Sequence, residues 1–272
     1  MAYPAWAPLI LATAALSSAG GMAADLQART AAAFDRYVIL TETRLQKDPA
    51  FLWIDSLPGA RRQPIHEQLR RKELAIERLT TKDGSRNVDV PDGLIHHWIG
   101  TAFVENATID QALAILQNYD QHQQIYAPTV ASSKLLSRKD DRFHFFLRFL
   151  MKKVITVVVN SEHDARFSRP ASNRAEGWIT STRIAEVENP GTPEEREKPV
   201  GHDGGYLWRL NTYWRLLARD GGVYIQCESV SLTRGIPFGL GWVVGPFVTS
   251  IPRESLTFTL ERTRQQLEKT RG

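Results

Sequence analysis

The chain has 272 residues, 42% of them apolar, and its 34 basic and 30 acidic side chains give a formal net charge of +4. This length and apolar content suffice for one domain with a substantial core and an additional helical segment. Charges of both signs are scattered along the chain, with no basic stripe among aromatic residues, which excludes nucleic acid and leaves a mild attraction to anionic lipid head groups.

The first 24 residues carry no charge and run from an apolar stretch into small residues. This pattern predicts a signal peptide over residues 1–24, cleaved near Ala23 or Ala24, and hence a periplasmic or secreted protein, although the segment lacks the usual basic residue at its start. An uncleaved anchor is the alternative, because a helix of this length reaches across ~30 Å of hydrocarbon. With Cys227 as the single cysteine, an intrachain disulfide is excluded.

Residues 25–90 are predicted to form a helical N-terminal extension. Apolar residues at helical spacing predict one helix over 26–46 and a second over 64–80. The turn-forming sequence KDGSRNVDVPDG at 82–93 then ends the extension.

Residues 91–272 are predicted to form an α+β domain. A helix is expected over 108–126 with Thr108 as its N-cap, and a long final helix from Pro252. Period-two patterns and turn signals between them predict a curved antiparallel sheet of about six or seven strands, at 94–106, 129–137, 142–150, 152–161, 174–188, 206–219 and 222–234. The final helix is the one long element left to cover a face of this sheet.

The RDGG turn at 219–222 allows the two faces of its hairpin to be predicted. Any even-length loop here pairs even-numbered residues of the first strand with odd-numbered residues of the second. The face taken as the inner one is apolar with small hydroxyls: Trp208, Leu210, Thr212, Trp214, Leu216, Val223, Ile225, Cys227, Ser229 and Ser231. The other face is charged, with Arg215 and Glu228 as diagonal neighbours. Tryptophans opposite small residues favour a cavity on the inner face, and a simply packed core is the alternative.

The sequence GIPFGLGWVVGPFVTSIPRE at 235–254 admits three interpretations. A phosphate-binding loop is excluded because Val244 stands where a third glycine is needed and no further strand follows. Three prolines argue against a straight membrane-spanning helix. The remaining interpretation is an apolar hinge before the last helix, with entrance residues at the mouth of the cavity: Phe238, Trp242 and Phe247.

The histidines indicate no catalytic or metal constellation. His96 and His97 are adjacent on a strand and therefore point to opposite faces, which excludes a shared metal ion. The SEHD sequence at 161–164 fails as a triad for the same reason, and a solvated strand end is expected for His163. For His202 and Asp203, in a glycine-flanked loop, ordinary turn chemistry is expected.

Two arginines interrupt otherwise apolar or small-residue strands. Structural ion pairs of Arg148 and Arg183 with Glu162, Glu186 or Glu228 are expected, and the alternative is a guanidinium that holds a ligand carboxylate or head group. The charged loop over 188–205 is either a rim or lid or a solvated connection.

From residue 92 onward the sequence resembles the START-like superfamily, also called SRPBCC or helix-grip. The resemblance is carried by an ordered set of segments: GLIHHWIGTAFV, YDQHQQIYAP, FHFFLRFLMKKVITVVVN, STRIAEVENPG, YLWRLNTYWRL, GGVYIQCESVSLTRGIP and SIPRESLTFTLERTRQQL. It implies a sheet that grips the C-terminal helix around a deep apolar pocket for a sterol, lipid, quinone or polyketide. No shared catalytic motif exists to transfer.

The expected function is an exported carrier of an apolar small molecule, with transient membrane contact, no metal and no cofactor. The expected lining comprises Trp208, Leu210, Trp214, Cys227, Ser229, Phe145, Leu147, Arg183, Leu256 and Leu260. The alternatives are a cyclase-like or hydrolase-like enzyme with paired acid and base in the same cavity, or an envelope interaction module.

Overall fold

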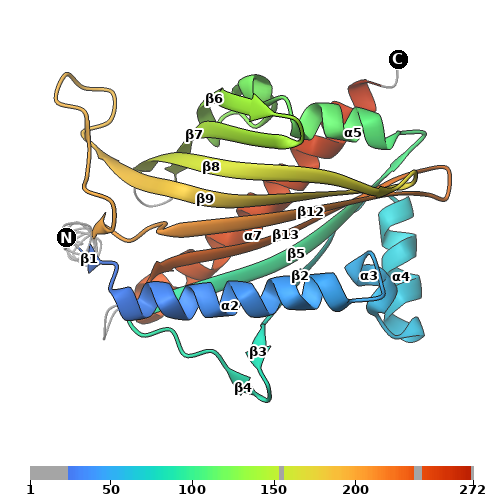
Figure 1. Cartoon of the computed structure of the whole chain (residues 1–272), viewed down its shortest axis with the longest axis horizontal. Coiled ribbons are helices and arrows are strands. Elements are labelled where there is room, and N and C mark those ends of the chain that lie inside the picture. The colour runs from blue at the N-terminus through green and yellow to red at the C-terminus, as the bar shows by residue number, and fades with distance from the viewer. Residues whose placement is uncertain (1–23, 153–155, 236–240, 271–272) are drawn as a thin grey trace, which may run out of the picture.

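A computed structural model of the protein describes residues 24–152, 156–235 and 241–270, with the backbone alone at 241–249. Figure 1 shows a large antiparallel sheet with helix α2 (Ala28–Lys47) in front of it and helix α7 (Gly241–Lys269) running obliquely behind it. The architecture is therefore α+β, with a long C-terminal helix held by a curved sheet, as the sequence predicts.

The main sheet has nine strands, more than the six or seven predicted. Its order is β2 (Ala75–Arg78), β5 (Gly93–Glu105), β13 (Gly222–Arg234), β12 (Arg209–Arg219), β9 (Arg174–Glu188), β8 (Thr156–Ala171), β7 (Arg142–Lys152) and β6 (Val130–Lys139), and β10 (Arg196–Glu197) adds to β9. Two short ladders complete the described strands: β1 (Ala24–Asp25) with β11 (His202–Asp203), and β3 (Lys82–Asp83) with β4 (Arg86–Asn87).

The helix predicted over 64–80 is wrong beyond Arg70. Helix α4 spans Gly59–Arg70, after the short α3 (Trp53–Ser56), and Lys72 with a φ of 63° ends the helical course. The chain then enters β2, which pairs with β5. The predicted extension therefore contributes an edge strand to the sheet, and the domain boundary at 90/91 stays a prediction.

The helix predicted over 108–126 is divided into three pieces: α5 (Ile109–Leu116), the 3-10 turn η1 (Tyr119–Gln121) and α6 (His122–Ile125). Its predicted N-cap is confirmed, because the Thr108 hydroxyl accepts the Gln111 N–H and the Gln111 side chain accepts the Thr108 N–H.

The predicted start of the final helix at Pro252 is also wrong. Helix α7 already begins at Gly241, so much of the predicted hinge is helical. The proposed entrance residues Phe238, Trp242 and Phe247 lie outside the residues whose side chains are described. Within the described residues, no helix combines the length and apolarity that crossing a bilayer requires.

The predicted register of the β12–β13 hairpin is confirmed. Trp214 lies opposite Cys227, and Leu216 lies opposite Ile225. Both pairs belong to the core cluster between the sheet and α7, together with Leu256, Leu260 and Leu267 of the helix.

The second, charged face of the hairpin is covered rather than solvated. A second core joins Phe34 and Tyr37 of α2 to Tyr213, Val230 and Leu232 of the sheet. Trp208 belongs to this α2-side core, so its predicted place beside Trp214 is wrong. The reason lies in its position one residue before β12, where the regular alternation of the strand has not begun.

The guanidinium of Arg215 shows why a charged side chain fits under this layer. Its side chain is 7% exposed and donates to the backbone oxygens of Leu45 in α2 and Phe51 just beyond the helix. A cation at the C-terminal end of a helix satisfies carbonyls that lack partners within the helix and interacts favourably with its dipole. The charge therefore fastens α2 to the sheet.

The close approach of α7 to the sheet depends on Gly100 of β5. A Cβ at this position would lie 2.5 Å from Leu260 Cδ1 and 3.2 Å from Ile76 Cγ1, and Leu260 is fully buried. The absence of a side chain at Gly100 thus sets how closely the helix can rest on β5.

Gly100→Ala is expected to lower the free energy of unfolding by about 1–3 kcal/mol, because the methyl group overpacks this contact. Gly59→Ala is the matched control, since a Cβ there meets nothing within 4 Å at the start of α4. Urea denaturation followed by circular dichroism measures both. A Gly100 variant as stable as the Gly59 variant would contradict this account of the helix–sheet contact.

Candidate functional site

The face of the sheet that α7 covers contains most of the predicted lining residues. Six of them are buried in one cluster between the sheet, α5 and α7: Phe145, Leu147, Trp214, Cys227, Leu256 and Leu260. Burial raises the pKa of the Cys227 thiol, so this cysteine behaves as a small apolar side chain. This end of the face is core.

The same face is less completely covered farther along the strands. Leu210, Thr212 and Ser229 are only half-buried although they lie on inner strands, and so are Ile179 and Trp98 in the same transverse row. Close-packed interiors rarely leave such positions accessible. This region, between the buried core and the end of the sheet, is the candidate site.

A row of polar side chains crosses the sheet at this place. The register puts Phe145 beside His163, His163 beside Ser181, Leu210 beside Ser231, and Ser231 beside His96, and Ser181 Oγ accepts the Leu210 N–H at 2.9 Å. His163, Ser181, Ser231 and His96 are all buried, with 2–7% of each residue exposed. An apolar face thus carries hydrogen-bonding groups at its centre.

His163 corrects the expectation of a solvated strand end. Its ring stacks on Phe145 with 5.1 Å between centroids and 15° between planes, and its Nε2 lies 2.9 Å from Ser161 Oγ. Burial lowers the pKa of His163 to about 3, with a smaller contribution from nearby His144. Sequence reasoning missed this because a histidine between Glu162 and Asp164 suggests water, yet the two carboxylates alternate to the opposite face.

The prediction that His96 and His97 leave opposite faces is confirmed. His96 lies on the α7 side, 3.1 Å from Thr233 Oγ1, and burial lowers its pKa to about 4. His97 lies under α2, where its Nε2 is 2.7 Å from Glu228 Oε1 and its Nδ1 is 2.8 Å from the Tyr37 hydroxyl.

The contacts around His97 define a buried chain of hydrogen bonds. With Nε2–H donating to Glu228, the neutral ring accepts the Tyr37 O–H at Nδ1, and the Tyr37 oxygen accepts the Thr81 N–H at 2.7 Å. Arg44 of α2 forms an ion pair with the same Glu228 oxygen. The whole chain is consumed in joining α2, the segment after β2 and the sheet, which explains it as structural.

The loop at 188–205 is fastened to the sheet by ion pairs. Arg148 Nη2 lies 2.9 Å from Glu195 Oε2, and Arg183 pairs with Glu197. Arg183 lies opposite Glu162, on the face away from α7, so the structure does not bring it to the predicted cavity. Ion pairing of both arginines is confirmed, with partners in the loop in place of the glutamates that the sequence suggested.

Two buried carboxylates hold the end of this loop. Glu186 accepts the backbone N–H groups of Gly204 and Tyr206, and Asp203 accepts those of Gly205 and the Trp208 indole. Burial, followed by the charge of Glu186, raises the pKa of Asp203 to about 6. The expectation of ordinary turn chemistry at His202 and Asp203 is therefore too simple, since Asp203 also anchors Trp208.

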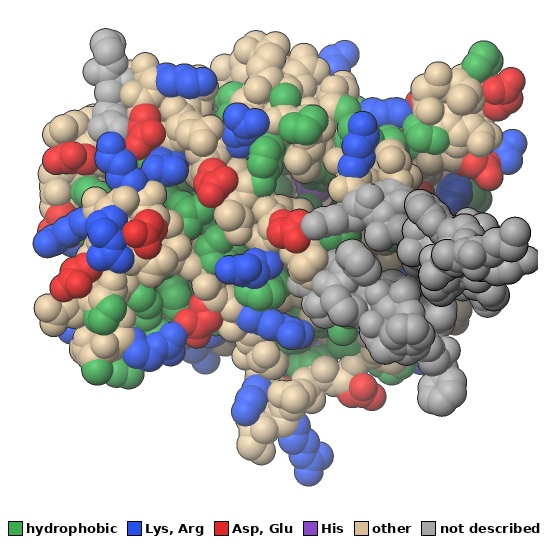
Figure 2. Space-filling model, turned by 180° about the vertical axis from the view of Figure 1, so that it is seen from behind, with side chains coloured by type: hydrophobic (Ala, Val, Ile, Leu, Met, Phe, Trp, Pro, Cys, Tyr) green, Lys and Arg blue, Asp and Glu red, His purple; other side chains and the backbone are tan. Residues whose placement is uncertain are grey.

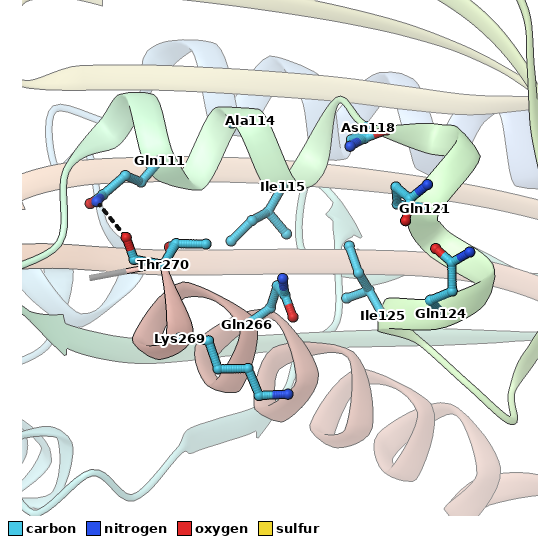
Figure 3. A pocket seen from close by; sticks show the side chains of 10 residues that line it. All are labelled: Gln111, Ala114, Ile115, Asn118, Gln121, Gln124, Ile125, Gln266, Lys269 and Thr270. Carbon is cyan, nitrogen blue, oxygen red and sulfur yellow. Dashed lines mark hydrogen bonds between the residues drawn. The ribbon is translucent and has the colours of Figure 1, made fainter. Parts of the chain in front are cut away.

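The two hollows defined by described residues lie elsewhere. One of about 640 Å³ opens between α5, η1, α6 and the last turn of α7, and Figure 3 shows its amide side chains and the hydrogen bond from Gln111 to the Thr270 backbone oxygen. The other, of about 270 Å³, lies beside Asp48, Arg174 and Glu176. Neither coincides with the polar row, and the sequence predicts neither.

The charges around the α7 side do not mark a polyanion-binding face. Figure 2 shows this side of the molecule, where basic and acidic side chains are interspersed rather than gathered by sign. Among the described residues, no group of three or more His, Cys, Asp or Glu side chains is placed to hold a metal ion.

Comparison with known proteins yields similar structures only. No family model matches the chain, and no curated protein matches it. The chain is similar to the protein TTHA0849 from Thermus thermophilus, with a TM-score of 0.44, 11% identity, and 65% of this chain and 98% of that one covered. It is also similar to a fragment of a STAR-related lipid transfer protein from Xanthomonas axonopodis, with a TM-score of 0.45, 16% identity, and 70% and 98% covered.

A third similar structure is the Zhui aromatase/cyclase from a Streptomyces species, with a TM-score of 0.41, 14% identity, and 65% of this chain and 95% of that one covered. The helix-grip arrangement that the resemblance implies is seen directly in the antiparallel sheet and the helix α7 behind it. At these levels of similarity the function has to come from the chain's own residues.

Tyr37→Phe is expected to lower the free energy of unfolding by about 1–3 kcal/mol, because it leaves the buried Thr81 N–H and His97 Nδ1 without their partner. Tyr119→Phe makes the same chemical change at a buried hydroxyl that has no hydrogen-bond partner among the described residues. Its effect should stay within ~0.5 kcal/mol or be stabilising. Equal losses in the two variants, measured by urea denaturation, would contradict the assigned hydrogen bonds.

Proposed function

We propose that the protein binds an apolar small molecule between the sheet and helix α7. The observation that carries this proposal is the half-buried state of Leu210, Thr212 and Ser229 on inner strands, next to a fully buried apolar core. Accessible apolar and hydroxyl groups on the concave side of a sheet form the mixed lining that small-molecule sites use, where apolar walls bind and a few polar groups orient.

The ligand class follows from the chemistry of this face. Its strand residues are aliphatic, aromatic, Ser, Thr and neutral His, and the described part of it carries no charged side chain on the strands. Burying a charged ligand group there would leave that charge unpaired, at a cost of several kcal/mol. A lipid, quinone, sterol-like or polyketide-like molecule with at most neutral polar groups is the class that fits.

Binding is favoured over catalysis by the distribution of carboxylates. Acid–base catalysis would need a histidine and a carboxylate within hydrogen-bond reach of one another in the cavity. In the described part of the sheet, Glu228 and Glu186 lie on the opposite face or in the loop clamp, away from His163. Reaction of the bound molecule is therefore the secondary hypothesis.

Export and membrane contact are part of the same proposal. The uncharged residues 1–24 support a cleaved signal peptide, and cleavage after Ala23 would leave the β1–β11 pairing intact. A carrier in the cell envelope would load its ligand at a membrane surface through the apolar segment at 235–254. N-terminal sequencing of the protein from its host checks this: a mature chain beginning at residue 24 or 25 is expected, and a retained Met1 would contradict cleavage.

Thr212→Phe is expected to weaken binding of an apolar fluorescent probe such as 1-anilinonaphthalene-8-sulfonate or a pyrene-labelled lipid by at least about tenfold, ~1.4 kcal/mol. The added ring would occupy the space beside the α7 face. Thr180→Phe is the matched control, because Thr180 is exposed and belongs to the neighbouring row that faces away from α7.

Both variants are titrated with the probe and compared in thermal stability. Retained binding in the folded Thr212 variant would show that the ligand does not lie on the α7 face. Equal loss in the Thr180 variant would show that the probe responds to something other than this cavity.

A further inference from the structure

The orientation of the His163 ring is fixed by its neighbours. It stacks on Phe145 and meets Phe149 edge-on, with 6.3 Å between centroids and 90° between planes. Its side chain is 2% exposed, and Ser161 lies two residues away on the same face of β8. The ring therefore presents its two nitrogens in fixed directions.

The hydrogen bonds of Ser161 decide which nitrogen carries the proton. The Ser161 hydroxyl donates to the Leu147 backbone oxygen at 3.0 Å, so its oxygen lone pair is what His163 Nε2 meets at 2.9 Å. Nε2 must then bear the hydrogen, and in a neutral imidazole Nδ1 is left as an acceptor. Because burial strongly lowers the pKa of His163, the ring stays neutral over the physiological range.

His163 Nδ1 has no hydrogen-bond partner among the described residues. The nearest hydroxyl in the row cannot be assumed to serve it, because Ser181 Oγ already accepts the Leu210 N–H. A buried acceptor without a donor costs ~1–3 kcal/mol, and native proteins rarely leave one without a reason. A bound molecule that donates a hydrogen bond would remove this cost.

We propose that the ligand of this site is an apolar molecule bearing a hydroxyl or N–H donor, and that His163 Nδ1 accepts the hydrogen bond from that donor. This inference rests on the proposed function, because it concerns the molecule that occupies the α7-side cavity. It selects alcohols, phenols and quinols over their ethers, esters and quinones, since molecules with acceptors alone leave Nδ1 unpaired.

The discriminating experiment compares two probes that differ only in the donor. 1-Pyrenebutanol and its methyl ether share the same apolar body, and both report binding by fluorescence. The wild-type protein is expected to bind the alcohol about five- to tenfold more tightly, the usual value of one neutral hydrogen bond. His163→Phe keeps a ring to stack on Phe145 and should bring this ratio close to one, with the ether bound at least as tightly as before.

His122→Phe is the matched control. His122 is a second buried histidine, in α6, whose Nε2 lies 3.3 Å from the Ile115 backbone oxygen and whose ring packs against Tyr119 and Tyr126. The same substitution there should leave the alcohol-to-ether ratio unchanged. A general loss of packing would alter the affinity for both probes alike and would not move the ratio.

Three outcomes separate the inference from the proposed function. Equal binding of both probes by the wild type overturns the donor requirement while the cavity stands. A ratio that survives His163→Phe overturns the role of His163. Binding of neither probe, together with failure of the Thr212 test, overturns the cavity itself.

A second measurement keeps the inference testable if His163→Phe does not fold. In ¹⁵N-histidine-labelled wild-type protein, His163 should show a protonated Nε2 and a bare Nδ1 from about pH 5 to 8. The Nδ1 resonance should move on adding 1-pyrenebutanol and stay in place with the ether. A protonated Nδ1, or one indifferent to the alcohol, contradicts the inference.

Discussion

The carboxylate of Glu228, fully buried between the sheet and helix α2, is the interaction on which the arrangement of the molecule depends. It accepts from His97 and pairs with Arg44, and His97 in turn accepts from Tyr37 of the same helix. Losing one member would leave others buried without partners, which costs far more than a surface ion pair is worth. This network commits α2 to one face of the sheet.

With that face closed, the opposite face is the one left for α7 and for any ligand. Arg215 strengthens the same closure by holding the backbone at the end of α2. The α7 face is then divided along the strands into a filled end, where Trp214, Cys227 and Leu260 meet, and a partly accessible region around Thr212 and Ser229. The protein can be stable at one end of the cavity and receptive at the other.

The sequence predicts the parts of this arrangement that follow from local periodicity. The pairing of Trp214 with Cys227 comes from the parity of one hairpin loop, and nearly all strands of the main sheet are predicted close to their observed bounds. Segment 64–80 misleads because Ile65, Leu69 and Ile76 keep helical spacing across a chain reversal at Lys72. The α2 cover is missed because Arg215 and Glu228 read as solvent-facing, and what buries them comes from residues far away in the sequence.

The candidate site shows the same division. Leu210, Ser229, Phe145 and Leu147 are placed on the α7 face by alternation alone, whereas Trp208 fails where the alternation stops and Arg183 lies on the opposite face. His163 has no sequence signal beyond its parity, because its importance comes from a tautomer fixed by Ser161 and from the missing partner of Nδ1. Such a feature emerges only when three strands are brought together.

The central claim, that the α7 face holds an apolar molecule, is tested most directly by native mass spectrometry of the full protein purified from its own host without added detergent. The account predicts one apolar organic molecule per chain, released by organic solvent and carrying a hydroxyl or N–H group. Protein that is consistently empty, and that also takes up no molecule when incubated with a lipid extract of its host, would contradict it.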